Sequence, residues 1–441
     1  MSSMEYEWIH LLVFFFSLLI LMMLSGMPVA VGFLTLNIVG LYFFLGGESA
    51  MSLLAMNAFS SVGKFALIPI PLFILMGDLL MRTGMAGKIV EAVDLWVGRI
   101  PGRLSLSSVG GGTLFGALSG ASMASVAMLG STLVPEMTKR GYKPSMSVSS
   151  ILAGGGLAVL IPPSALGVLL GAVAKVSIAQ LLLGGILPGL ILAIMYVAYF
   201  GIRATLQPDL APPYLAPSVT INEKLRSILV VLPMLSLIMV VTGFIFLGIA
   251  TPSESAAMGV VATLVLAACY RSLTWRALKA SLMSTMTTTS MMLLVIVGSS
   301  GFSQLLAATG STSGLASIVR NLEITPIMMV IIMLLIVLFL GCFIDTISIM
   351  LVTIPIFMPI VLEMGIHPIW FSHLVLIQLE LAGITPPFGV LLFVMKGVQQ
   401  HLKISEIYFA ALPIVVIQIL LVFLLMTFPE IVTFLPEMAS Q

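Results

Sequence analysis

The chain has 441 residues, of which 60% are hydrophobic and only 8% are charged, and its mean hydropathy is +1.22. Soluble proteins are far less apolar, so we expect an all-α polytopic membrane protein embedded in a lipid bilayer. The formal net charge of +1 gives no reason to expect a nucleic-acid partner.

Apolar runs that can cross a bilayer as helices follow one another along the chain. The first run has no preceding Lys or Arg, so we expect a retained span and not a cleaved signal peptide. In chain order we predict about ten membrane spans and two re-entrant helical hairpins: spans near 8–25, 28–46 and 65–81, a hairpin near 104–138, spans near 145–174, 178–202, 228–248, 253–270 and 282–300, a hairpin near 326–362, and spans near 368–395 and 408–428.

Two further segments are more polar than these spans. Residues 85–98 carry Lys88, Glu91 and Asp94 between apolar positions, a pattern typical of an amphipathic helix at the membrane surface or of a solvated arm beside the first hairpin. Residues 204–227 contain four prolines among polar residues and predict a cytoplasmic linker between two halves.

The positive charges are unevenly distributed over the predicted loops. Cytoplasmic loops collect Lys and Arg. The predicted topology places fifteen of the 18 basic residues inside and only Lys64, Lys175 and Arg320 outside. The N-terminus is then expected to be periplasmic.

The first hairpin is predicted from its flanks. Arg103 and Lys139 both lie inside, and the 35 residues between them are too few for two full spans. The chain must therefore enter the membrane and return, with its turn near Ala121 among small and hydroxyl residues.

The two halves of the chain carry the same pattern of prolines and glycines. Pro135, Gly141, Pro144 and Pro162-Pro163 recur 224 positions later as Pro359, Gly365, Pro368 and Pro386-Pro387. Residues 136–145 include three basic residues, whereas the equivalent residues 360–369 include no Lys or Arg, which predicts inverted repeats. Inverted repeats with interrupted helices at mid-membrane depth are typical of secondary transporters.

The two prolines of each Pro-Pro pair lack the backbone N–H groups that would bond carbonyls in the preceding helical turn. The carbonyls expected to lose their partners are those of Ala158, Val159, Ala382 and Gly383. An alkali cation prefers oxygen ligands and can satisfy such carbonyls in a membrane interior. One pair alone would suit a kinked structural helix, but the duplication favours ion sites.

Four acidic residues lie in or beside apolar segments, where an ionisable side chain is costly and often functional. Asp345, near the turn of the second hairpin, and Glu380, just before the second Pro-Pro pair, are the strongest candidates. Glu254 follows a Thr-Pro-Ser sequence and is expected to favour a helix start. Asp78 has Arg82 four residues later, which predicts an ordinary ion pair within a helix.

Five motifs, in this order and at this spacing, carry a family resemblance: Ser119-Gly120 through Gly130, Ile161-Pro162-Pro163-Ser164, Gly248 to Glu254, Gly341 to Asp345, and Glu380 to Gly389. They resemble the large membrane subunit, of the DctM type, of tripartite ATP-independent periplasmic (TRAP) transporters. The family hairpin commonly reads Ser-Gly-Ser, and Ala121 stands here in place of the second serine.

The resemblance implies a sodium-driven importer of an organic acid in the bacterial inner membrane, with Na+ as coupling ion. It implies an elevator mechanism, in which a transport domain with both hairpins moves against a scaffold. It also implies two partners, a small four-helix membrane subunit and a soluble periplasmic substrate-binding protein.

Combined with the predicted spans, it divides the chain as follows: N-terminal scaffold spans, 1–60; a first repeat, 61–203, with a hairpin near 104–138 and a broken span at 161–164; a cytoplasmic linker, 204–227; scaffold spans, 228–280; a second repeat, 281–428, with a hairpin near 326–362 and a broken span at 384–388; and a C-terminal tail, 429–441.

The candidate site residues lie at the hairpin turns and at the two breaks. The candidate sodium ligands are Ser119, Gly120, Ser122, Ala158, Val159, Gly341, Asp345, Ala382, Gly383, Thr385 and Pro386. The substrate is expected between the hairpin turns, and its candidate ligands are Ser119, Ser164, Ser299, Ser300, Glu380 and Thr385.

Two other classes of function compete with this one. An intramembrane enzyme would need a catalytic constellation such as His-Glu-x-x-His, which this chain lacks, so we expect no enzyme. A self-sufficient sodium- or proton-coupled carboxylate symporter would share the broken spans and stays open as an alternative. Loss of transport without a periplasmic receptor would separate the tripartite transporter from it.

Overall fold

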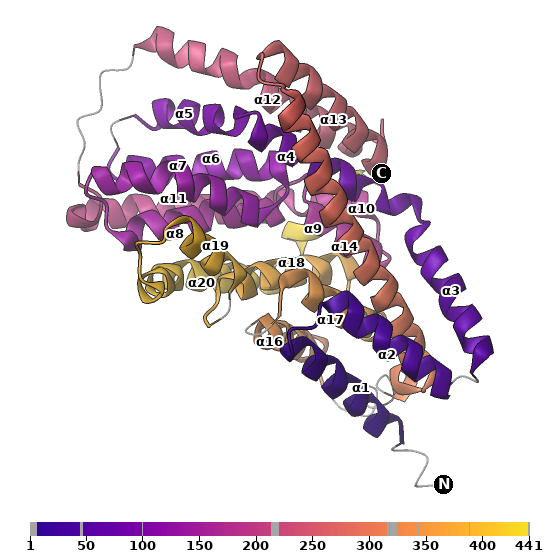
Figure 1. Ribbon diagram of the computed structural model, residues 1–441. Coiled ribbons are helices and arrows are strands. Elements are labelled where there is room, and N and C mark those ends of the chain that lie inside the picture. Colours follow the sequence, from indigo (N-terminus) through magenta and orange to yellow (C-terminus); the bar gives the residue numbers. More distant parts are fainter. Residues whose placement is uncertain are drawn as a thin grey trace.

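The computed structural model describes residues 7–44, 47–98, 100–212, 220–314, 317, 324–341, 344–387 and 389–439. Secondary structure within these residues is helical throughout (Figure 1). Seven of the described helices have the length and hydropathy of membrane spans: Phe65–Arg82, Ile178–Leu206, Ile221–Phe246, Pro252–Cys269, Trp275–Ala308, Thr346–Glu363 and Ile404–Thr427. The expectation of an all-α polytopic membrane protein is confirmed. Several predicted features fall outside the described residues, among them Arg99, Arg320, positions 213–219 of the linker, positions 342–343 of the second hairpin and position 388 of the second break.

The N-terminal region contains a helix that was not predicted. Its helices are α1 (Glu7–Leu24), α2 (Val29–Phe44), α3 (Glu48–Val62) and α4 (Pro69–Arg82), the last preceded by the 3-10 turn η1 (Phe65–Leu67). Serines and an asparagine lower the hydropathy of α3 below that of a span, so the apolar pattern did not reveal it. A polar contact with a distant segment fixes α3, because the Asn57 amide donates to the Ser300 carbonyl at 3.2 Å.

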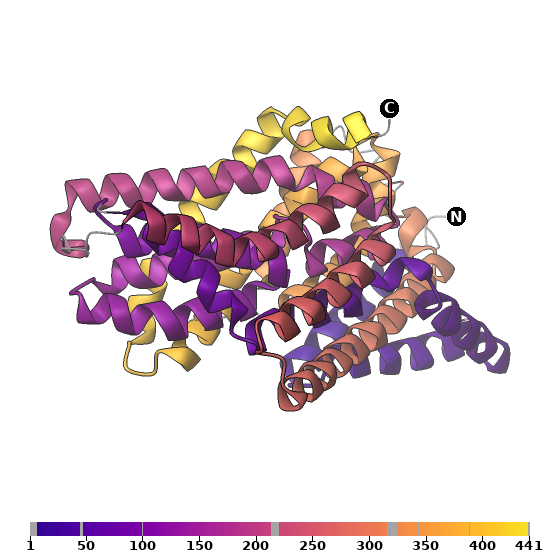
Figure 2. The same cartoon turned by 90° about the horizontal axis from the view of Figure 1, so that it is seen from above.

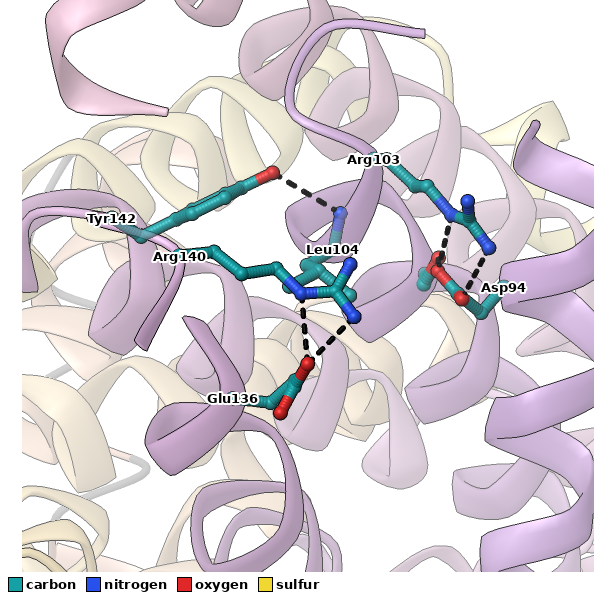
Figure 3. Close-up of polar contacts among 7 residues, drawn as sticks. Asp94, Arg103, Leu104, Glu136, Arg140 and Tyr142 are labelled. Atoms are coloured by element: carbon teal, nitrogen blue, oxygen red, sulfur yellow. Dashed lines mark hydrogen bonds and ion pairs between the residues drawn. The ribbon is translucent and has the colours of Figure 1, made fainter. Parts of the chain in front are cut away.

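Hairpin 1 and the helix before it comprise α5 (Met85–Val97), α6 (Arg103–Ser119) and α7 (Ser122–Lys139). α5 packs along α6, as expected for an arm beside the hairpin. The buried Arg103 donates to both carboxylate oxygens of Asp94 on α5, at 2.8 and 2.5 Å (Figure 3). Such a bidentate, charge-assisted pair fixes the open end of the hairpin. Tyr142, beyond α7, accepts a bond from the Leu104 N–H at 3.5 Å and joins the two arms there.

Both Pro-Pro pairs interrupt a helix, as the duplication predicted. The first interrupted helix consists of α8 (Pro144–Gly156), the 3-10 turn η2 (Leu157–Val159) and α9 (Ala165–Ala174). The second consists of α18 (Pro368–Ile384) and α19 (Val390–Val398). Both Pro-Pro peptide bonds are cis.

The middle of the chain forms α10 (Ile178–Gly184), α11 (Ile186–Leu206), the 3-10 turn η3 (Pro208–Leu210), α12 (Ile221–Phe246), α13 (Pro252–Cys269) and α14 (Trp275–Ala308). α12 begins within the segment predicted to be a linker. A capping box explains this start, because Thr220 and Glu223 each bond the other's backbone N–H, at 3.3 and 2.8 Å. α14 has 34 residues and extends beyond the predicted span at both ends.

The C-terminal part forms hairpin 2, α16 (Pro326–Gly341) and α17 (Thr346–Glu363), and then α20 (Ile404–Thr427) and α21 (Glu430–Ala439) after the second broken helix. α21 lies where a tail was expected. It packs against α10 and buries Val432 completely, so tertiary contacts order this short amphipathic segment.

The two halves are interleaved. Each hairpin packs against the first part of the broken helix that follows it, α6 and α7 on α8, and α16 and α17 on α18. The return arm of each hairpin also contacts the second part of the other half's broken helix, α7 on α19 and α17 on α9. α5 to α8 lie at one end of the molecule and α1 to α3 toward the other, both in Figure 1 and from above in Figure 2.

Candidate ion and substrate site

The turn of hairpin 1 is built by a glycine. Gly120 ends α6 with φ +61°, a left-handed conformation that glycine adopts without strain, and its N–H donates to the Gly116 carbonyl at 2.8 Å. α4 approaches this turn closely, because a Cβ on Gly77 would lie 2.5 Å from the Ser119 carbonyl oxygen. Two glycines thus hold the turn against the neighbouring helix.

The Ser119 hydroxyl points back into its own hairpin. It lies 3.1 Å from the Ser125 hydroxyl, which also lies within hydrogen-bond distance of the Ala121 carbonyl, at 3.0 Å. Ser125 was not among the predicted residues. The run of serines on both sides of the turn was the signal that could have identified it.

The turn of hairpin 1 contacts the first break. The Gly120 carbonyl accepts a bond from the Ala165 N–H at 3.3 Å, where α9 begins. Ser164 caps the same helix by accepting from the Gly167 N–H at 3.1 Å, so its hydroxyl oxygen is engaged locally. No donor among the described residues reaches the carbonyls of Ala158 and Val159, as expected when the residues four positions on are prolines.

The second break keeps one carbonyl paired that was expected to be free. The Ala382 carbonyl accepts from the Thr385 N–H at 3.3 Å, because the last turn of α18 tightens to an i+3 bond when proline removes the i+4 donor. The Thr385 hydroxyl donates to the Leu381 carbonyl at 2.6 Å. The carbonyls of Gly383 and Thr385 both face Gly389, where an added Cβ would lie 2.7 and 3.0 Å from their oxygens.

Pro386 belongs to the same break, and Tyr408 of α20 reaches the residue after it. The Tyr408 hydroxyl donates to the Pro387 carbonyl at 2.6 Å. The two residues are 21 positions apart, and the sequence around neither of them predicts this contact.

The turn of hairpin 2 lies beside the second break. A Cβ on Gly341 would lie 2.2 Å from the Ala382 Cβ, so only glycine permits this approach. The half-buried Asp345 caps α17, accepting from the Ser348 N–H at 3.1 Å and from the Ser348 hydroxyl. Its carboxylate therefore caps the start of α17.

Glu380 connects the two halves. The residue is buried in α18 with only 5% of its surface exposed, and Ser122, the first residue of α7, donates to its Oε2 at 2.9 Å. Its Oε1 has no hydrogen-bond partner among the described residues. Gly156, at the end of α8, faces this oxygen, since a Cβ there would lie 2.7 Å from it. The carboxyl group thus lies between hairpin 1 and both broken helices.

These groups fit an alkali cation. They offer the Glu380 Oε1 and the Ala158 and Val159 carbonyls, which have no donor among the described residues, and oxygen ligands are those that a hard cation prefers. Four helices, α7, α9, α17 and α19, begin at the turns or breaks, and their N-termini favour negative charge nearby.

Ser299 and Ser300 lie apart from the hairpin turns. Ser299 donates to the Leu351 carbonyl of α17, and Ser300 donates to the Asn57 side chain of α3 at 2.8 Å. Both line a separate cavity. The other two acidic residues have the roles expected of them, since Asp78 pairs with Arg82 at 2.5 Å and Glu254 completes a capping box with Thr251.

Comparisons with known proteins agree with this architecture. Residues 16–431 match the family model of the tripartite ATP-independent periplasmic transporter, DctM component. The C4-dicarboxylate TRAP transporter large permease protein DctM of Pseudomonas aeruginosa is 32% identical over 88% of each chain. The ectoine TRAP transporter large permease protein TeaC of Halomonas elongata is 30% identical over 95% of this chain and 97% of its own.

A solved structure shares the fold at low sequence identity. The YdaH transporter of Alcanivorax borkumensis, described as having an unusual topology, superposes with a TM-score of 0.59 at 15% identity and covers 87% of this chain and 89% of its own. The family match over nearly the whole chain and the two relatives of at least 30% identity establish membership. The chain belongs to the DctM family, the large permease components of TRAP transporters.

Proposed function

We propose that this chain is the permease subunit of a sodium-coupled importer of an organic acid. Relatives named for C4-dicarboxylate and for ectoine support a small organic solute as cargo. The family name describes a tripartite periplasmic system, which supports two partners, a small four-helix membrane subunit and a soluble binding protein that delivers the solute.

One observation carries the proposal of ion coupling. The Glu380 carboxyl is buried between the halves with one oxygen bound by Ser122 and the other without a partner among the described residues. An incompletely satisfied acidic group in a membrane interior is costly unless a cation accompanies it. Sodium bound by Oε1 and by nearby carbonyls would supply that compensation. The cargo carboxylate would then lie near the bound cation and the helix N-termini.

The proposed orientation places the N-terminus in the periplasm and the linker after α11 in the cytoplasm of a bacterial inner-membrane protein. It is supported by the distribution of charge. The start of α6, the end of α7, the start of α8, the end of α11 and the start of α20 lie at the left of Figure 1. Basic residues stand at or next to these helix ends, namely Arg103, Lys139, Arg140, Lys143, Arg203 and Lys403.

The proposed movement is of the elevator type. Both hairpins and both broken helices pack on one another and could move as a unit. α2, α4, α13 and α14 form another packed group, since α4 contacts α13 and α14, and α14 contacts α2. This division differs from the sequence-based one in assigning α4 and α14 to the static group.

The test is uptake by proteoliposomes that contain this permease, its small subunit and the binding protein. Labelled C4-dicarboxylate and ectoine serve as probes, with an inward sodium gradient or an equal potassium gradient. We expect uptake of at least one probe that requires sodium and the binding protein. Equal uptake in both gradients would refute sodium coupling, and equal uptake without the binding protein would support the self-sufficient symporter.

A further inference from the structure

A cavity of about 640 Å³ lies between α3, α9, α14 and α17, apart from the two breaks. Its volume falls within the range of sites that hold small molecules. α17 belongs to hairpin 2 and α9 to the first broken helix, whereas α3 and α14 lie outside both. The cavity therefore opens at a boundary between the proposed moving group and its surroundings.

Two lysines line this cavity together. Lys64 follows α3 and Lys175 ends α9, and both side chains are exposed. Neither forms a salt bridge with any described residue, and the lining contains no Asp or Glu. A second cavity of about 480 Å³ is lined by the same two lysines. These are two of the three basic residues that the predicted topology places on the periplasmic side.

The backbone at Lys175 is in a conformation that usually selects glycine. Lys175 has φ +57° at the C-terminal end of α9, in the left-handed region. Position 175 thus carries a lysine although its backbone conformation would favour glycine.

The side of the cavity formed by α3 and α14 is polar and internally hydrogen-bonded. The Asn57 amide donates to the Gln304 side-chain oxygen at 2.8 Å, and the Ser300 hydroxyl donates to the Asn57 oxygen at 2.8 Å. These bonds hold α3 against α14 and leave the lysines as the charged groups of the lining.

We propose that this cavity admits the carboxylate group of the cargo before it reaches the ion site. The inference rests on the proposed import of an organic acid, and it assigns Lys64 and Lys175 as the groups that attract the anion. A unit charge about 6 Å away in water favours an anion by about threefold, so two lysines give about tenfold. Added salt reduces the effect because both side chains are exposed.

The first experiment measures the local potential without any substrate. Ser303 lines the cavity and is replaced by cysteine in a background that carries Cys269→Ala and Cys342→Ala. The permease with its small subunit is labelled with a negatively charged sulfonatoethyl methanethiosulfonate and with its positively charged trimethylammonium analogue. The ratio of the two rates reports the charge of the cavity.

We expect Lys64→Gln and Lys175→Gly each to lower the anion-to-cation rate ratio by about tenfold, since each lysine favours the anionic reagent and disfavours the cationic one by about threefold. Lys175→Gly relaxes the left-handed backbone, so loss of folding does not confound the result. Lys403→Gln, at the start of α20, is the control and should leave the ratio unchanged. A ratio unaffected by both cavity variants would overturn the inference, even if sodium-coupled uptake is confirmed.

The second experiment measures uptake in proteoliposomes with the binding protein. We expect the double variant Lys64→Gln with Lys175→Gly to raise KM about tenfold at low salt with kcat little changed. The double variant Lys64→Arg with Lys175→Arg should keep KM near the wild-type value. A fall in kcat at constant KM, or no rescue by arginine, would count against anion admission. Failure of all uptake in the wild type would instead refute the proposed function and leave the labelling result to decide on the cavity.

Discussion

The bond between Ser122 and Glu380 gives the most direct test of the site. Ser122→Ala removes the hydroxyl that donates to Glu380 Oε2 at 2.9 Å and leaves both oxygens of a buried carboxyl without a partner among the described residues. A hydrogen bond to a charged group contributes about 1.5–3 kcal/mol, so we expect the free energy of unfolding to fall by that amount. Ser131→Ala is the matched control, because its exposed hydroxyl bonds only the carbonyl of Met128 on the same helix.

The assay is reversible unfolding in mixed detergent micelles, with Ser122→Ala combined with Glu380→Gln in a double-mutant cycle. A neutral amide accepts a weaker bond than a carboxylate, so Ser122→Ala should cost about 1 kcal/mol less in the Glu380→Gln background. Effects that add to within about 0.5 kcal/mol would refute the coupling.

Sodium should stabilise the wild type by about 2.7 kcal/mol at one hundred times its Kd, and Glu380→Gln should reduce this increment. An increment that Glu380→Gln leaves intact would remove Glu380 from the ion site.

Two further variants test the close approaches at the turn and the break. Gly77→Ala places a methyl group 2.5 Å from the Ser119 carbonyl and should destabilise the protein by about 1–3 kcal/mol, whereas Gly87→Ala, with no atom near its added Cβ, should be neutral or stabilising. Equal unfolding midpoints for the two would contradict the packing described here. Tyr408→Phe removes the bond to the Pro387 carbonyl and should weaken sodium binding about fivefold to tenfold, as measured by sodium-dependent uptake. An unchanged sodium dependence would show that this tyrosine does not support the second break.

The sequence predicted those parts of the fold that depend on the residues of a short segment and not on distant contacts. Prolines at a constant offset identified both breaks, and basic flanks with a glycine between small residues identified hairpin 1. α3 was not predicted because Asn57 finds its polar partners on α14, more than two hundred residues later in the chain. α21 was missed because its burial depends on α10.

The candidate site was less predictable than the breaks, because its contacts depend on tertiary packing and on the detailed geometry of helix ends. Glu380 could be ranked from its depth in an apolar segment, but its bond to Ser122 depends on how hairpin 1 meets α18. The partner of the Ala382 carbonyl depends on a local tightening of the helix end, which proline permits but does not require. Side-chain partners across the two halves follow from tertiary packing and not from spacing along the chain.

The interleaving of the halves has a consequence for biosynthesis. α7 and α9 leave the ribosome long before α19 and α17, the helices that they contact in the finished protein. After insertion of the first half, the surfaces of α7 and α9 that later contact α19 and α17 must therefore be covered by lipid or by insertion factors. The protein can reach its working form only after nearly the whole chain has been translated.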